Sequence, residues 1–339
     1  MQLSELEQRL QDPAQAEALS LFGGCPSIIV EVDEADLAGR ESRPPNASRG
    51  ASSVLAVGPA KCPVIGIVDV GADEADMPAL LDVAVPSREE AERIASAVAE
   101  SPVAAMTLVG LTRVGERVTI PDRLITESLA YSALQHGAEF QGWLAGRDRK
   151  PPAPEPEDPP ILIDRQAGEL HLLLNRPQKR NAYSGAMRDA LCEALSLATQ
   201  DPTIERIVLA GKGPSFSAGG DLDEFGEATD AGVAHAARTT RSAARLMHSL
   251  RDKVEVHLHG ACVGAGIELP AFAGHLRATR DAFFMLPEVR FGLIPGAGGT
   301  ASILSRVGRL NLNYMALTGD RIDAQTALAW GLIDAIDDA

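Results

Sequence analysis

The sequence is poor in aromatic side chains, in cysteine and in positive charge, and each shortage narrows what the protein can be. Phe, Trp and Tyr make up only 4% of the 339 residues, whereas glycine alone contributes 31. A core built from such a chain packs with small side chains and closely spaced backbones. Hydrophobic residues at 45% and charged residues at 23% are typical of a globular protein, and the length allows two domains or one large one.

Positive charge is outnumbered, with 31 Lys and Arg against 47 Asp and Glu, a net charge of −16. Such an acidic surface repels phosphate backbones, so we expect no nucleic-acid partner. An anionic ligand would need a local basic patch, and Arg176, Lys179, Arg180 and Lys212 offer one. Charge alone does not separate a binding patch from ordinary solvated side chains.

The four cysteines, at positions 25, 62, 192 and 262, form no CxxC pair and no Cys/His ligand spacing. We therefore expect reduced, mostly buried thiols and no metal site. No run of about 18 apolar residues predicts a membrane span. The first twenty residues are polar and helical in pattern, without the basic start and apolar run of a secretory signal. These features predict a cytoplasmic protein that does not associate with membranes.

A proline-rich, charged segment at 147–160, RDRKPPAPEPEDPP, predicts a stiff linker between residues 1–146 and 161–339. In the second part, strands expected at 161–164, 170–174, 204–210 and 254–258 alternate with helices at 185–199, at 233–251 and from about 264. This alternation favours an α/β fold. The first part predicts strands at 27–32, 54–57, 64–68 and 82–85, a loop at 39–53, and helices at 89–100, 102–112 and 122–136. No motif there carries chemistry.

Four segments of the second part carry the candidate chemistry: NRPQKRNAYS (175–184), GPSFSAGGDLDEF (213–225), HGACVGAGIELPAFA (259–273) and FFMLPEVRFGLIPGAGGTASIL (283–304). GGDL and GAGIEL put small residues at helix starts, where backbone N–H groups are unpaired and the helix dipole adds positive potential. Two such N–H groups aimed at one point make an oxyanion hole. Glu268 and Glu288 could then serve as acid and base, with pKa values raised by apolar surroundings. Each segment alone also has an ordinary structural explanation.

Together with LTGDRIDAQTALAWGLID, these segments resemble the enoyl-CoA hydratase/isomerase family, the crotonase superfamily, in order and spacing over 161–339. The resemblance implies a core of ββα spiral units with a helical covering region, assembled as a homo-oligomer, either a trimer or a dimer of trimers. It implies hydration of a 2-enoyl-CoA thioester to the 3-hydroxyacyl-CoA, as in fatty acid metabolism. It implies no metal and no redox cofactor, because coenzyme A is part of the acyl-CoA substrate.

The resemblance also implies residue roles. Backbone N–H groups of Gly220 and Ala265 would hold the thioester oxygen; many relatives have glycine at the second position, and alanine serves if its φ is negative. Glu268 would orient and activate water, and Glu288 would exchange the α-proton. Contacts to coenzyme A are implied for the Ala218 carbonyl, the turn of Asp221, Leu222 and Asp223, and the side chains of Lys179 and Arg180.

Two alternatives to hydration stay open. One is an isomerase or another CoA-thioester lyase or hydrolase of the same superfamily, although the presence of both glutamates favours hydration. The other is a non-catalytic member that binds acyl-CoA or a partner. The sequence also departs from the family, with Pro270 early in the expected helix and Gly274-His275 where a Cys-Asp pair is usual. For His275, and for His257 and His259 nearby, we favour structural or surface roles.

The first part bears a weaker resemblance to the region that follows the GLID segment in the family, at 80–113 and 122–147. We therefore interpret residues 1–146 as a degenerate copy of the fold that supplies covering helices to the second part. An unrelated accessory domain is the alternative.

Overall fold

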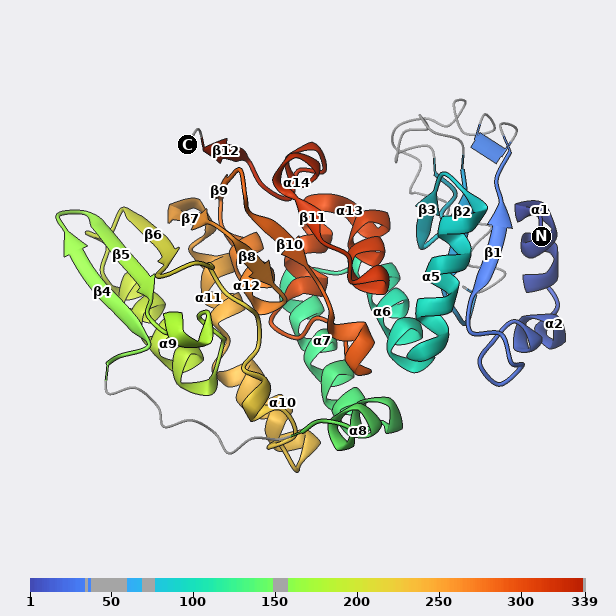
Figure 1. Ribbon diagram of the computed structural model, residues 1–339, viewed down its shortest axis with the longest axis horizontal. Coiled ribbons are helices and arrows are strands. Elements are labelled where there is room, and N and C mark those ends of the chain that lie inside the picture. Colours follow the sequence, from blue (N-terminus) through green and yellow to red (C-terminus); the bar gives the residue numbers. More distant parts are fainter. Residues whose placement is uncertain (34–35, 38–59, 69–76, 149–157, 338–339) are drawn as a thin grey trace.

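The computed structural model describes residues 1–33, 36–37, 60–68, 77–148 and 158–337. The expected loop at 39–53, the strand expected at 54–57 and most of the linker lie outside the described residues. We call the described residues up to 148 the first half and those from 158 the second half. Figure 1 shows the first half at the right and beneath the second half.

A six-stranded sheet organises the second half in the order β12-β9-β7-β6-β5-β4. The strands predicted at 161–164 and 170–174 form an antiparallel pair, and the remaining neighbours are parallel. Side chains of β5 alternate between buried and half-buried, which directs Leu170, Leu172 and Leu174 into the core. The strands are β4 (Ile161–Gln166), β5 (Glu169–Leu174), β6 (Arg206–Gly211), β7 (Val254–Leu258), β9 (His275–Thr279) and β12 (Ala335–Asp337).

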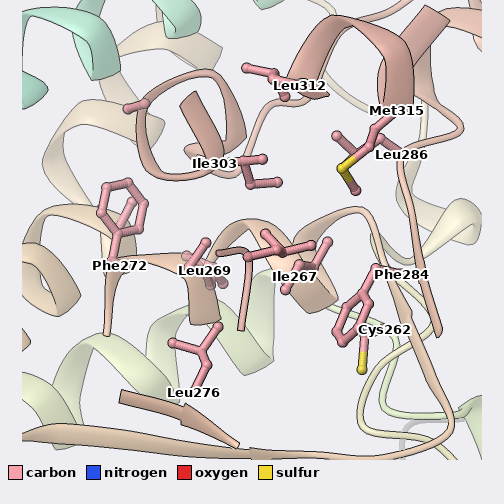
Figure 2. Close-up of a cluster of buried hydrophobic side chains, with 14 of the residues drawn as sticks. Cys262, Ile267, Leu269, Phe272, Leu276, Phe284, Leu286, Ile303, Leu312 and Met315 are labelled. Atoms are coloured by element: carbon pink, nitrogen blue, oxygen red, sulfur yellow. The ribbon is translucent and has the colours of Figure 1, made fainter. Parts of the chain in front are cut away.

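A smaller sheet, β11-β10-β8, carries the segment that leads to Glu268. Its strands are β8 (Ala261–Val263), β10 (Phe283–Met285) and β11 (Ile322–Asp323). Strand β8 passes through Gly264, which has φ of +49°, into the short helix α12 (Ala265–Glu268). Figure 2 shows Ile267 and Leu269, the two neighbours of Glu268, among buried apolar side chains that include Phe272 and Ile303. The core therefore holds the backbone at Glu268 in place.

Helices cover these sheets, and two predicted helices are shorter than expected. The helix predicted at 233–251 is wrong as one element, because Ser242 takes an extended conformation and caps a second helix through Arg245 N. The helix expected from 264 ends at Glu268, since Pro270 opens a 3₁₀ turn instead. The α-helices are α9 (Gly185–Gln200), α10 (Ala231–Thr240), α11 (Ala243–Ser249), α13 (Gly299–Thr318) and α14 (Ala324–Ala329). The 3₁₀ turns are η2 (Pro177–Lys179), η3 (Leu222–Glu224), η4 (Arg251–Lys253), η5 (Pro270–Phe272) and η6 (Glu288–Phe291).

The first half begins with helices and a small parallel sheet, β1-β2-β3, and continues as four helices. Ser87 and Thr119 cap the helices that follow them by accepting N–H hydrogen bonds. The elements are α1 (Leu3–Leu10), α2 (Pro13–Ala18), β1 (Ile28–Glu31), β2 (Val64–Ile67), β3 (Val83–Val85), α5 (Arg88–Glu100), α6 (Pro102–Gly115), α7 (Ile120–Gln135) and α8 (Ala138–Ala145). Among the described residues no single helix is long and apolar enough to cross a membrane; only α5 and α6 together, bent by 110°, pass that test.

The two halves share one hydrophobic core. Helices α6 and α7 pack against α13, and α7 also packs against α10 (Figure 1). A polar junction supports this packing at Asp82, whose side chain is fully buried. Asp82 pairs with Arg113 of the first half and, at 3.1 Å, with Arg309 of α13, and its carbonyl accepts from Asn313 Nδ2 at 3.0 Å. Separating the halves would remove these contacts from Arg309 and Asn313, whereas the pair of Asp82 and Arg113 would stay within the first half.

Candidate functional site

A cavity of about 340 Å³ lies where elements from both halves meet. Its walls come from α7 of the first half and from α10, α11, α12, the GGDL turn and the loop before α13 in the second half. The predicted oxyanion-hole residues and both predicted glutamates line it: Gly220, Ala265, Glu268 and Glu288.

Glu268, the last residue of α12, is only 2% exposed. Its Oε2 accepts hydrogen bonds from Ala297 N at 2.7 Å and Gly299 N at 2.9 Å. Its Oε1 accepts no hydrogen bond from the residues that the structure describes. One oxygen is therefore fixed by the backbone, and the other is left for a ligand in the cavity.

Glu288 opens η6 directly after Pro287 and is also buried. Within the described residues, its Oε2 has no hydrogen-bond partner. A Cβ added to Gly264 would lie 2.3 Å from Glu288 Oε1 and 3.8 Å from Glu268 Oε1. Both carboxylates therefore converge on the same α-carbon, and no side chain larger than a hydrogen fits there.

Burial controls the protonation of this pair. Desolvation, followed by repulsion from Glu288 and Glu127, raises the pKa of Glu268 well above its ordinary value. Desolvation also raises the pKa of Glu288 to about 8. Since two neighbouring carboxylates in an apolar site resist ionising together, the pair holds a proton near neutral pH. Such a pair can both donate and accept a proton.

The two predicted oxyanion-hole amides are also available. Tyr183 forms a bridge with Gly220 in which Tyr183 N donates to Gly219 O and Asp221 N donates to Tyr183 O, so the bridge does not use Gly220 N–H. Ala265 is the first residue of α12, and its N–H has no acceptor within that helix. Its φ is negative, as an alanine at this position requires.

A third buried carboxylate, Glu127 of α7, lines the same cavity, and sequence reasoning missed it. Its Oε1 accepts from Gly298 N at 2.7 Å, and its Oε2 accepts from Thr300 N at 2.9 Å and from Thr300 Oγ1. Desolvation raises the pKa of Glu127 to about 7. Its neighbours along α7 give no sign of this role, because its partners lie more than 170 positions away in the sequence.

Of the residues expected to contact coenzyme A, Asp221 lines the cavity. Asp221 is buried and pairs with Arg176 at 2.9 Å, while Lys179 bridges Asp221 at 3.4 Å and Asp223 at 3.0 Å. The basic patch is therefore partly neutralised by the acidic turn. The N–H of Ala218 donates to the carbonyl of Arg180, whose side chain is exposed. The carbonyl of Leu222 accepts a hydrogen bond from Arg147.

The three histidines near the site take the structural or surface places that we favoured. His257 contacts Glu255 at 2.6 Å, His259 contacts Gly213 O at 2.9 Å, and His275 is exposed beside Asp334. None of them lines the described cavity. In the described part of the chain, no group of three or more His, Cys, Asp or Glu side chains is arranged to hold a metal ion.

Known proteins match this chain over the part of the sequence that contains Gly220, Ala265, Glu268 and Glu288. The family model described as enoyl-CoA hydratase/isomerase matches residues 164–339. The 2,3-dehydroadipyl-CoA hydratase of Escherichia coli is 34% identical over 176 residues, covering 52% of this chain and 68% of that protein. The 1,2-epoxyphenylacetyl-CoA isomerase of Escherichia coli is 33% identical over 184 residues, covering 52% and 70%.

Among solved structures, an enoyl-CoA hydratase of Mycobacterium smegmatis shares 34% identity, covers 53% of this chain and 70% of its own, and superimposes with a TM-score of 0.49. The relatives carry the names of both hydratases and isomerases, so the matches leave the reaction open between these two. The match to the family model confirms the α/β fold of the crotonase type. Because the family model covers more than half of the sequence, this chain belongs to the enoyl-CoA hydratase/isomerase family.

Proposed function

We propose that the protein adds water across the double bond of a 2-enoyl-CoA thioester and forms the 3-hydroxyacyl-CoA. The observation that carries the proposal is the convergence of Glu268 and Glu288 on Gly264, each with one oxygen that accepts no hydrogen bond from the described residues. Addition of water needs a base at Cβ and an acid at Cα in the same step or in close succession. A pair of carboxylates that share a proton meets both needs.

In the proposed reaction, the N–H groups of Gly220 and Ala265 donate to the thioester oxygen and draw electron density from the double bond. Cβ becomes electrophilic. Glu268 Oε1 takes a proton from water as the water oxygen bonds to Cβ, and protonated Glu288 delivers a proton to Cα. Exchange with solvent then returns both carboxyls to their starting states, so the net reaction consumes one water. No metal or redox cofactor enters this balance.

Substrate binding completes the proposal. We propose that the acyl chain occupies the cavity and that coenzyme A lies along Ala218 and the Asp221–Asp223 turn, with Lys179 and Arg180 near its phosphates. The expected trimer or dimer of trimers is likewise part of the proposal, as are the cytoplasmic location and the lack of nucleic-acid and membrane partners. Light scattering on the purified chain would measure its oligomeric state.

An isomerase is the second candidate, because several relatives carry isomerase names and a double-bond shift requires only one carboxylate. Crotonyl-CoA distinguishes the two, because hydration removes its conjugated absorbance. We expect that absorbance to fall with the parent protein and to fall at least about a hundredfold more slowly with Glu268→Gln and with Glu288→Gln. A Glu268→Gln variant that still converts a 3-enoyl-CoA to the 2-enoyl isomer at the parent rate would favour isomerisation instead.

A further inference from the structure

Four consecutive backbone amides at the start of α13 are divided between two carboxylates in strict alternation. Ala297 N and Gly299 N donate to Glu268, at 2.7 and 2.9 Å, whereas Gly298 N and Thr300 N donate to Glu127, at 2.7 and 2.9 Å. The amino end of a helix attracts anions through its unpaired N–H groups and its dipole. Here it receives one anion from each half of the chain.

The hydrogen bonds of Glu127 distinguish it from the other two acids. Both of its oxygens are engaged, and Thr300 Oγ1 adds a third donor at 2.6 Å. Glu268 Oε1 and Glu288 Oε2, by contrast, receive no hydrogen bond within the described residues. Both oxygens of Glu127 are thus held by segment 297–300, although the residue lines the same cavity.

The backbone that the two acids hold cannot fix its own conformation. Gly298 has φ of +107°, and with Gly299 beside it the segment could adopt many conformations in isolation. A Cβ would lie 2.5 Å from Phe272 at Gly298 and 2.7 Å from Glu268 Cγ at Gly299, so both positions require glycine. External hydrogen bonds must therefore select the observed conformation.

We infer that Glu127 is a positioning residue, which fixes segment 297–300 so that its amides clamp Glu268 Oε2 and keep Oε1 turned to the substrate. The first half of the chain thus completes the active site of the second. This inference rests on the proposed function, since it assigns Glu127 to the support of the base in that reaction. A misplacement of about 1 Å at such a base costs about a hundredfold in rate.

The charges around Glu127 predict a change in the pH–rate profile, which a purely structural role of Glu127 would leave unchanged. Glu127 faces Glu268 on α12, Glu288 on η6 and Arg238 on α10, with Tyr131 beside it on α7. Repulsion from Glu127 helps to keep the pKa values of Glu268 and Glu288 high. Neutralising Glu127 should therefore move the pH–rate profile toward lower pH.

The experiment compares Glu127→Gln with Glu139→Gln in the full chain. Glu139 is a matched control, since its two oxygens also accept from backbone amides at a helix start, Val103 N at 2.7 Å and Ala104 N at 2.9 Å. For Glu127→Gln with crotonyl-CoA we expect kcat to fall about 10- to 100-fold with little change in KM. We also expect the alkaline limb of the profile to shift to lower pH, and the amides of 297–300 to exchange faster with deuterium. Glu139→Gln should lose thermal stability but keep kcat, profile and exchange in that segment.

A Glu127→Gln protein with parent kcat, parent pH profile and parent amide exchange would overturn the inference. If that variant does not fold, Thr300→Val removes only the hydroxyl hydrogen bond to Glu127, and the same three readouts decide. A parent protein that does not hydrate crotonyl-CoA would overturn the proposed function instead. In that event, faster exchange at 297–300 in Glu127→Gln still supports the positioning role, and unchanged exchange still overturns it.

Discussion

The two halves of the molecule contribute to the site in different ways. Residues 158–337 carry every recognisable motif and supply Glu268, Glu288 and both candidate oxyanion-hole amides. Residues 77–148 carry no motif that indicates chemistry, yet α7 lines the cavity and contributes Glu127. Motifs thus reveal residues whose role depends on the local backbone. They do not reveal residues whose role arises when distant segments pack together.

Separating the two halves would expose buried side chains of α13 in the second half. Helix α13 is buried along much of its length because α6 and α7 cover it, and Arg309 within it is held by Asp82 of the first half. The first half supplies packing and charge compensation, whereas the second holds the proposed acid/base pair. The interpretation of the first half as a degenerate copy of the fold stays a prediction. The following experiments test how the contributions of the two halves differ.

The largest effect is expected on cutting the chain. A fragment of residues 158–339 would expose the apolar face of α13 and leave Arg309 without its buried acid, so we expect it to be insoluble or unfolded and to lack activity. Circular dichroism and size-exclusion chromatography would measure this. A folded, active fragment would show that the second half is self-sufficient.

The polar junction should show the next largest effect. Asp82→Ala removes the fully buried acid that Arg309 and Arg113 share and should lower the free energy of unfolding by about 3–5 kcal/mol. Glu31→Ala is the control, because its pair with Arg88 is exposed and should cost under about 1 kcal/mol. Denaturant titration measures both. Equal losses in the two variants would contradict a special role for the junction.

Ionisation of Glu288 should lower the stability of the folded protein at alkaline pH. Its folded-state pKa, about 8, lies above the ordinary 4.5, so its contribution to stability is present below about pH 4.5 and is lost as the pH rises through 8. Glu288→Gln removes the titration. We expect the variant to be more stable than the parent by on the order of a few kcal/mol near pH 9 and nearly equal near pH 5. A stability difference between the two proteins that does not change with pH would refute the raised pKa.

The smallest effect is expected at the edge of the cavity. Lys179 is already paired with Asp221 and Asp223, so Lys179→Ala should raise KM for an acyl-CoA by about two- to fivefold and leave kcat unchanged. Lys61→Ala, at an exposed position in the first half, should change neither. Steady-state kinetics at low and high salt would measure the effect. A KM unaffected by loss of Lys179 would remove it from the coenzyme A contacts.

Local physical chemistry made part of this structure predictable. The helix predicted at 185–199 is present as α9, which Ser184 caps, and the residues predicted as a strand at 170–174 lie in the main sheet. The break between α10 and α11 was missed, because helical periodicity continues across Ser242 while its side chain stabilises a new start. Glu127 was missed for a different reason, since its partners are amides that only the tertiary packing of α7 on α13 brings near.

Reaction of crotonyl-CoA in deuterium oxide, followed by nuclear magnetic resonance, tests the acid/base pair most directly. Because Glu288 exchanges its proton with solvent, the account predicts a 3-hydroxyacyl product with a hydroxyl at Cβ and one deuterium at Cα, and loss of that product in Glu268→Gln and Glu288→Gln. A shifted double bond, or deuterium at Cα without any hydroxyl at Cβ, would contradict it.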